Sequence, residues 1–239
     1  MAETGNLSGA MNKVDWASRL DPFSPGPPSS EAYLELRQGR TEAAAEAFQK
    51  AIDRDPYNYK NYEALGNLQR QQLDDPEAAV TSYRRALERN PHSATVISRL
   101  GEALLSAGTS DENLEEARTH YEWLQARGRI PLRDLYTLGK VQTRLGEPEE
   151  AIETFEEAKE RADTEPEESP SDDSRQTQRR AFLDSLDLAI ADALVVEGSF
   201  EEAREYLAQS EAEQAPAILT LLNDDPVSYR QSVFDAPIN

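Results

Sequence analysis

The chain has 239 residues, of which 25 are basic and 46 acidic, and its formal net charge is −21. This charge argues against nonspecific binding to nucleic acids and to anionic membranes, because both depend on clusters of Lys and Arg. The chain has no cysteine, which excludes disulfides, thiolate metal sites and a cysteine nucleophile.

The first 28 residues are predicted to be a partly ordered N-terminal tail. A short apolar cluster around Trp16 favours one docked turn or short helix, and the DPFSPGPP sequence after it favours an irregular stretch. Trp16 either caps the exposed end of the helical repeats that follow or docks into the groove of a neighbouring molecule, and we favour the capping role. Pro27 and Pro28 are expected to shorten the first helix of the repeats to about residues 30–38.

From residue 29 to residue 215, one pattern of small and aromatic residues recurs at helical spacing. The clearest copy has a glycine in a first helix, followed by small, aromatic and small residues in a second helix: Gly139, Ala151, Phe155 and Ala158. Intervals of three, four and seven residues place such side chains on one face of an α-helix. The pattern predicts five helical hairpins, at residues 29–57, 58–92, 93–130, 131–162 and 174–215.

The residue types at the repeated positions have a packing explanation. Small residues are expected where the two helices of a hairpin cross too closely for a larger side chain: Gly66, Gly101, Gly139, Ala79, Ala117 and Ala151. Aromatic residues are expected to fill the space between successive hairpins: Phe48, Tyr83, Tyr121 and Phe155.

Prolines mark the expected ends of the helices. Pro56 and Pro91 are predicted to end second helices, because proline cannot continue a helix. Pro76 and Pro148 are predicted to open second helices, where the missing N–H group is not needed. Thr41 is expected to cap the start of the helix that contains it.

Two segments after the fourth hairpin have a different composition. Residues 163–173 (DTEPEESPSDD) are acidic and lack apolar side chains, which predicts a flexible insertion. A longer helix is expected over about residues 174–197, and residues 217–222 (AILTLL) predict a final capping helix over the last hairpin. Residues 223–239 are predicted to be a C-terminal tail that is ordered only in part.

The repeated pattern resembles the tetratricopeptide repeat (TPR) family over about residues 29–215. The family pattern repeats every 34 residues, whereas Gly66, Gly101 and Gly139 are 35 and 38 residues apart, and the last hairpin has Ala191 where glycine is usual. The resemblance implies an all-α fold: a right-handed superhelix, or solenoid, of about five TPR-like helical hairpins plus a C-terminal capping helix.

The resemblance also implies that the first helices of the hairpins line a concave groove and carry the partner contacts. The expected partner-binding groove residues are Lys60, Glu63, Asn67, Arg70, Arg99, Glu102, Arg133, Tyr136, Lys140 and Arg144. Basic residues outnumber acidic ones in this set, although the whole chain is strongly acidic. One interpretation is ordinary balancing of charge on helix surfaces. The other is a groove for an acidic or C-terminal peptide that is bound by Arg and Lys.

The carboxylate clamp of chaperone-binding TPR domains is a more specific version of such a groove. Asn67 and Arg133 match the clamp pattern, whereas Glu63, Arg99 and Thr137 stand where the family has other residues. So few matches do not support a heat-shock chaperone as the partner.

No catalytic or cofactor-binding constellation is visible in the sequence. His92 and His120 are far apart in the chain, and no zinc-protease, P-loop or dinucleotide-binding motif occurs. We therefore predict a protein that is not an enzyme and needs no metal or cofactor. It is expected to be a scaffold or adaptor that binds an unidentified protein, as a peptide or helix, in the concave groove. The alternatives are a self-associating structural protein, which would form a homo-oligomer, and an accessory subunit of a larger assembly.

Composition also suggests where the protein works. The chain has no run of about 18 apolar residues and no secretory leader pattern, so we expect no membrane partner and a cytoplasmic location. Only five of the 25 basic residues are Lys. Because an acid-rich, lysine-poor composition resembles that of salt-adapted proteins, we favour a halophilic source over an ordinary acidic protein.

Overall fold

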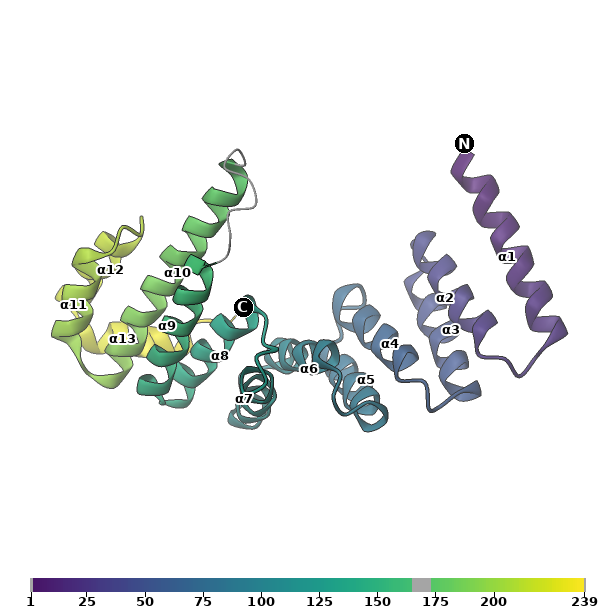
Figure 1. Ribbon diagram of the computed structural model, residues 1–239, viewed down its shortest axis with the longest axis horizontal. Helices are drawn as coiled ribbons and strands as arrows, with labels where there is room; N and C mark the ends of the chain where they lie inside the picture. Colours follow the sequence, from purple (N-terminus) through teal and green to yellow (C-terminus); the bar gives the residue numbers. More distant parts are fainter. Residues whose placement is uncertain (1, 165–172, 239) are drawn as a thin grey trace. The chain divides into compact units, whose positions relative to one another are not determined.

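The structure is a computed structural model that describes residues 2–164 and 173–238 (Figure 1). Every regular element in these two ranges is a helix, which confirms the predicted all-α class. The chain divides into two compact units, which we call unit 1 (Met1–Gly108) and unit 2 (Thr109–Asn239). The division lies between the two helices of the predicted third hairpin.

The described part of unit 1 contains α1 (Ala2–Leu20), α2 (Gly26–Arg37), α3 (Thr41–Arg54), α4 (Tyr59–Gln71), α5 (Pro76–Arg89) and α6 (Ala94–Ala107). The α2–α3 and α4–α5 pairs are hairpins at the places that the repeats predict. Each helix of the unit packs against the next one in the chain, so the core is a stack of neighbouring helices.

The described part of unit 2 contains α7 (Asp111–Gln125), α8 (Leu132–Leu145), α9 (Pro148–Thr164), α10 (Asp173–Glu197), α11 (Phe200–Gln209), α12 (Ala215–Asp224) and α13 (Pro226–Asp235). Successive helices pack in chain order here too, and α10 also contacts α8. In addition, α13 (yellow in Figure 1) turns back and packs against α10. The end of the described chain therefore lies beside the middle of unit 2.

Small residues at the helix crossings make room for aromatic rings. A Cβ atom placed on Gly66 would lie 2.8 Å from the Tyr83 ring, and one placed on Gly139 would overlap the Phe155 ring. Both contacts are too short for any side chain, which confirms the prediction for these glycines. The prediction for the aromatic residues needs a correction. These two rings pack against the glycine of their own hairpin, because the absent Cβ leaves space there, and not only between successive hairpins.

The helix starts follow the proline predictions with one correction. α5 begins at Pro76 and α9 at Pro148, and the Asp75 carboxylate accepts a hydrogen bond from the first turn of α5 at 3.0 Å. Thr41, however, is the first helical residue of α3 and not its cap. The residue at the cap position is Arg40, whose side chain binds a carboxylate of α2 instead of the first turn of α3.

The N-terminal segment is more helical than the sequence suggested. α1 has 19 residues, where only a turn or short helix was expected, and it packs against α2. α2 begins at Gly26, so Pro27 and Pro28 do not shorten it. They lie in its first turn, where their missing N–H groups have no partner to lose. Trp16 is 65% exposed, so the structure does not show the capping contact that we favoured.

The C-terminal segment also contains a helix where a partly ordered tail was expected. Asp225 caps α13, with its Oδ1 accepting a hydrogen bond from the Ser228 N–H at 3.0 Å, and Pro226 lies in the first turn. The predicted capping segment 217–222 lies within α12. Most of the predicted acidic insertion, at residues 165–172, lies outside the described residues.

Candidate functional site

The charged groove residues of unit 1 pair with one another. The Arg99 guanidinium on α6 binds the Glu63 carboxylate on α4 at 2.6 Å, and Arg70 on α4 binds the Glu102 carboxylate on α6 at 2.8 Å. All four side chains are partly buried. Binding of a partner's carboxylate by either arginine would therefore compete with its ion pair between α4 and α6.

The other two predicted groove residues of unit 1 differ in exposure. The Asn67 Oδ1 atom accepts a hydrogen bond from the Tyr83 hydroxyl at 2.8 Å, and burial raises the pKa of Tyr83. Lys60 is exposed. Of the six groove residues predicted in unit 1, Lys60 is thus the one that is exposed, and the other five are partly buried.

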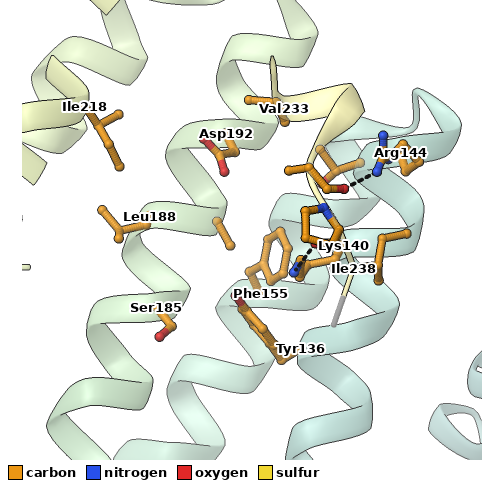
Figure 2. Close-up of a pocket in the computed structure, with 14 residues that line it drawn as sticks. Tyr136, Lys140, Arg144, Phe155, Ser185, Leu188, Asp192, Ile218, Val233 and Ile238 are labelled. Carbon is orange, nitrogen blue, oxygen red and sulfur yellow. Dashed lines mark hydrogen bonds between the residues drawn. The ribbon is translucent and has the colours of Figure 1, made fainter. Parts of the chain in front are cut away.

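In unit 2, two predicted groove residues bind main-chain carbonyl groups. The Lys140 Nζ atom donates to the Pro237 carbonyl oxygen at 3.1 Å, and Arg144 donates to the Ala236 carbonyl oxygen (Figure 2). Neither side chain forms a salt bridge with a carboxylate of a described residue. Burial lowers the pKa of both side chains, as expected for cations that lack a paired anion.

The remaining two groove residues of unit 2 are Tyr136 and Arg133. The Tyr136 ring lies 5.9 Å from the Phe155 ring and 5.8 Å from the Phe182 ring, and the Lys140 ammonium lies 5.6 Å from its centre. Arg133 is exposed, and its side chain forms no hydrogen bond or ion pair with a described residue. The structure therefore brings Tyr136, Lys140 and Arg144 together and leaves Arg133 outside this cluster.

A pocket of about 270 Å³ adjoins the two bound carbonyl groups (Figure 2). Its apolar lining comes from α9, α10, α12, α13 and the segment after α13: Phe155, Leu188, Ala189, Ile218, Val233 and Ile238. Ile238 is only 6% exposed, whereas Ala236 and Pro237 are exposed. The extended segment 236–238 is thus bound by its main chain and by one buried apolar side chain.

Asp192 on α10 is the acidic group of the pocket. Its Oδ1 atom accepts a hydrogen bond from the Tyr229 hydroxyl of α13 at 2.7 Å. Burial raises the pKa of Asp192 to about 6, although the Tyr229 hydrogen bond and the Lys140 charge act in the opposite direction. This carboxyl group therefore titrates nearer to neutral pH than an exposed aspartate does.

α13 and residues 236–238 together form what we call the 226–238 arm. Besides the contacts already described, Arg230 donates to the Val196 carbonyl oxygen of α10. No residue of α13 is buried. The arm is therefore attached to unit 2 by a few hydrogen bonds, by Ile238 and by Tyr229, which is partly buried and packs against the apolar core of the unit.

A polar cluster around Asp187 holds the neighbouring helices in place. The Asp187 carboxylate accepts bonds from Lys159 on α9 at 2.6 Å, from Tyr206 on α11 at 3.1 Å and from Ser210 at 3.1 Å. Burial lowers the pKa of Lys159, but its hydrogen bonds to Asp187 and to the Tyr206 hydroxyl outweigh that effect and raise the pKa. The cluster fixes α10 relative to α9 and α11, and so fixes the helix that carries Asp192.

Asp192 and two arm residues, Tyr229 and Ile238, were not among the residues predicted from the sequence. Asp192 could have been predicted from the register of the repeats. It directly follows Ala191, just as Lys140 directly follows Gly139 at the equivalent position of its own repeat. The arm residues carry no such signal, because they lie outside the repeats.

The described residues hold no group of three or more His, Asp and Glu side chains that could bind a metal ion. Within the same residues, no helix has the length and apolar character needed to cross a membrane. The site just described consists instead of donors and acceptors that hold protein atoms, beside an apolar pocket.

Comparison with protein families gives one match. A family model described as tetratricopeptide repeat matches residues 30–72, 64–116 and 110–166, which together make up more than half of the chain. A search of curated proteins finds no match.

Several solved structures share this fold. The crystal structure of MamA protein has a TM-score of 0.61 and 19% identity, and the alignment covers 77% of this chain and 88% of that one. For PilF of Pseudomonas aeruginosa the values are 0.51 and 23%, with 88% and 87% covered. For the structure of Naa15/Naa10 bound to HypK-THB they are 0.52 and 17%, with 98% and 37% covered. At these identities the likeness concerns the fold alone.

Proposed function

Since the chain belongs to the tetratricopeptide repeat family, we propose that it is a non-catalytic scaffold that binds an extended peptide of another protein on one face of unit 2. This face, which we call the α8–α10 face, is formed by Tyr136, Lys140, Arg144, Asp192 and the pocket beside them. The observation that carries the proposal is the way in which Lys140 and Arg144 hold two successive main-chain carbonyl groups.

Binding through main-chain carbonyl groups suits a peptide ligand. Every extended peptide presents such carbonyls, and a charged donor makes a stronger hydrogen bond to them than a neutral donor does. Selectivity then comes from the apolar pocket next to the carbonyls, whose wall includes the buried Ile238 side chain. Lys140 and Arg144 thus provide affinity for the main chain of a peptide, and the pocket provides the preference for an apolar side chain.

The charge of unit 2 favours ligands that are neutral or basic overall, in place of the acidic peptide suggested by sequence. Unit 2 has 31 acidic and 13 basic residues, whereas unit 1 has 15 and 12. The field of unit 2 therefore repels a strongly acidic ligand before it reaches Lys140 and Arg144.

The polar groups of the face support a role in binding and not in catalysis. Lys140, Arg144 and Asp192 each bond to a group of the chain itself. The neighbour that contains Naa15 was itself solved in a complex with other proteins. A role as an accessory subunit of a larger assembly is one form of the same proposal.

Selection from a library of displayed random peptides tests the proposal. We expect peptides to be enriched on the wild-type chain and to lose binding to the double variant Lys140→Glu/Arg144→Glu by about 100-fold or more, because two charge-assisted hydrogen bonds are lost. Fluorescence anisotropy with the enriched peptides measures the loss.

A matched control makes the same change of charge elsewhere in the predicted groove. The variant Lys60→Glu/Arg133→Glu replaces two exposed cations, one in each unit, and should bind the enriched peptides as wild type does. If both double variants lose the peptides equally, the proposal fails, because net charge and not the α8–α10 face would explain binding.

A second candidate function is self-association through the N-terminal segment. It is favoured by three large apolar side chains that are 64–85% exposed: Trp16, Leu20 and Phe23. Sedimentation velocity of the wild type and of the variant Trp16→Ser/Phe23→Ser shows whether the chain self-associates and whether these side chains are needed. A wild-type monomer over the micromolar range would remove this candidate.

A further inference from the structure

We propose that the 226–238 arm is a tethered internal ligand, so that the α8–α10 face binds partner peptides only when the arm leaves it. The partner's segment has the same form as the arm's tip: a proline followed by an aliphatic side chain that is buried at the edge of the pocket, where Ile238 forms part of the wall. This inference rests on the proposed function, because it takes the α8–α10 face to be the peptide-binding surface.

The tip of the arm has the form expected of a bound peptide. Two successive carbonyl oxygens, of Ala236 and Pro237, accept hydrogen bonds from cations of α8. The next residue, Ile238, is 6% exposed against the pocket. Proline fixes its own backbone φ and favours an extended residue before it, so less conformational entropy is lost on binding.

α13, which is the base of the arm, is attached to unit 2 by few contacts. α13 has no buried residue, and Val227 is 72% exposed. Its side-chain bonds to α10 are those of Tyr229 with Asp192 and of Arg230 with the Val196 carbonyl. Apart from Tyr229, which packs against the apolar core of unit 2, α13 buries little apolar surface, and such a helix belongs to the less stable parts of a fold. The arm can therefore leave while the hairpins behind it stay folded.

The connection between α12 and α13 can act as a hinge for the arm. Asp225 lies between α12 and α13 with a backbone outside the helical region (φ −151°, ψ 86°), and its side chain caps α13. α13 can thus keep its cap when it swings away as a unit. The short connection keeps the tip near its site at an effective concentration on the order of millimolar, so a partner peptide must compete with it.

The experiment uses the full chain and a fluorescein-labelled peptide with the sequence of residues 225–239 as the external probe. In the variant Ile238→Glu, a carboxylate replaces the buried side chain, so the variant's own arm no longer fits the pocket. We expect the probe to bind this variant about tenfold or more tightly than it binds the wild type, because it no longer competes with a tethered copy. Fluorescence anisotropy gives both dissociation constants.

The matched control is Val227→Glu. It puts the same carboxylate on the same arm, at a side chain that is 72% exposed, and should leave probe binding at the wild-type level. Hydrogen exchange provides an independent readout. Amides of α13 should exchange faster in Ile238→Glu than in wild type, and amides of α8 and α9 should not, which also shows that the variant remains folded.

The outcomes separate the two proposals. If the probe binds wild type and Ile238→Glu equally well, the arm is not a competitor and the inference is wrong, whereas the peptide-binding face survives. If the probe binds neither protein, and α13 exchanges faster in Ile238→Glu, the face does not bind such peptides and both proposals fail. Tighter binding that is lost again when Lys140→Ala/Arg144→Ala is added supports both.

Discussion

The two units place basic side chains on corresponding first helices but give them different partners. In unit 1, Arg99 and Arg70 meet carboxylates one repeat away, and their hydrogen-bonding groups are used within the fold. In unit 2, Lys140 and Arg144 meet carbonyl oxygens of an exposed, extended segment. A basic residue in a repeat groove therefore says little about ligands until its partner is known.

The register of the repeats explains the difference. Three residues before the small residue of the first helix, unit 1 has Glu63, which pairs with Arg99 of the next hairpin, whereas unit 2 has Tyr136, which offers no carboxylate. At the position that corresponds to Glu102, unit 2 has Asp192 on α10. This carboxyl group accepts a hydrogen bond from the Tyr229 hydroxyl of the arm, and Lys140 and Arg144 bond to main-chain carbonyls of the arm.

The largest expected effect comes from the glycine that each unit has at the helix crossing. Gly139→Ala should lower the free energy of unfolding by about 2 kcal/mol, and Gly66→Ala by about 1 kcal/mol, because the added methyl overlaps the Phe155 ring more than the Tyr83 ring. The better helix propensity of alanine offsets part of each loss. Urea unfolding followed by circular dichroism measures both free energies. A larger loss of stability for Gly66→Ala than for Gly139→Ala would contradict this expectation.

Asp192 should make the stability of unit 2 depend on pH. Its pKa is about 6 when folded and close to its ordinary value of 3.8 when unfolded, so the folded state binds more protons between these values. Stability from this group is therefore lost as pH rises from about 4 to about 6, by roughly 1–2 kcal/mol. Asp192→Asn should remove that loss and the exposed control Asp224→Asn should not, as urea unfolding at pH 4.5 and pH 7 can show.

Breaking an ion pair of unit 1 should have a smaller effect. Glu63→Gln leaves Arg99 without its carboxylate and should cost about 0.5–1 kcal/mol, because both side chains are only partly buried. A double-mutant cycle with Arg99→Gln should give a coupling energy of similar size. Zero coupling would mean that the pair contributes nothing. Neither variant should change binding of the labelled arm peptide.

The smallest effect is that of salt, and it should differ between the units. Unit 2 carries a net charge of −18 and unit 1 only −3, so screening of self-repulsion stabilises unit 2 more. We expect α8 to α11 to gain protection in hydrogen exchange between 0.1 and 2 M salt, by less than about 1 kcal/mol, and α2 to α5 to gain less. Equal gains in both units would argue against this charge asymmetry as a cause, and no gain at all would argue against salt adaptation.

The hairpins could be predicted from sequence because their contacts are local and periodic. Gly139 and Phe155 are 16 residues apart and recur as Gly66 and Tyr83. The same register identified Lys140 as a groove residue and, applied to the last hairpin, would also have identified Asp192. The ion pairs of unit 1 were within reach too, since opposite charges lie one repeat apart.

The contact of the 226–238 arm with the α8–α10 face could not be predicted in the same way. Lys140 and Pro237 are 97 residues apart, and the arm follows no repeat that would fix its position. The local cue is an apolar residue after a proline, in a segment that also contains Val227, Val233 and Phe234. Such a cue does not show which surface will bind it, because that depends on the donors and the apolar space that α8, α9 and α10 provide together.

The position of Ile238 has a practical consequence for work with the purified protein. A purification tag or fluorescent protein fused after residue 239 would start next to a side chain that is buried at the edge of the pocket. Such a fusion would pull on the arm or block the α8–α10 face, and interaction screens that use it would report an altered molecule. A tag placed before α1 is attached to unit 1 and not to the arm, so screening the two fusions in parallel would reveal which interactions depend on the tip.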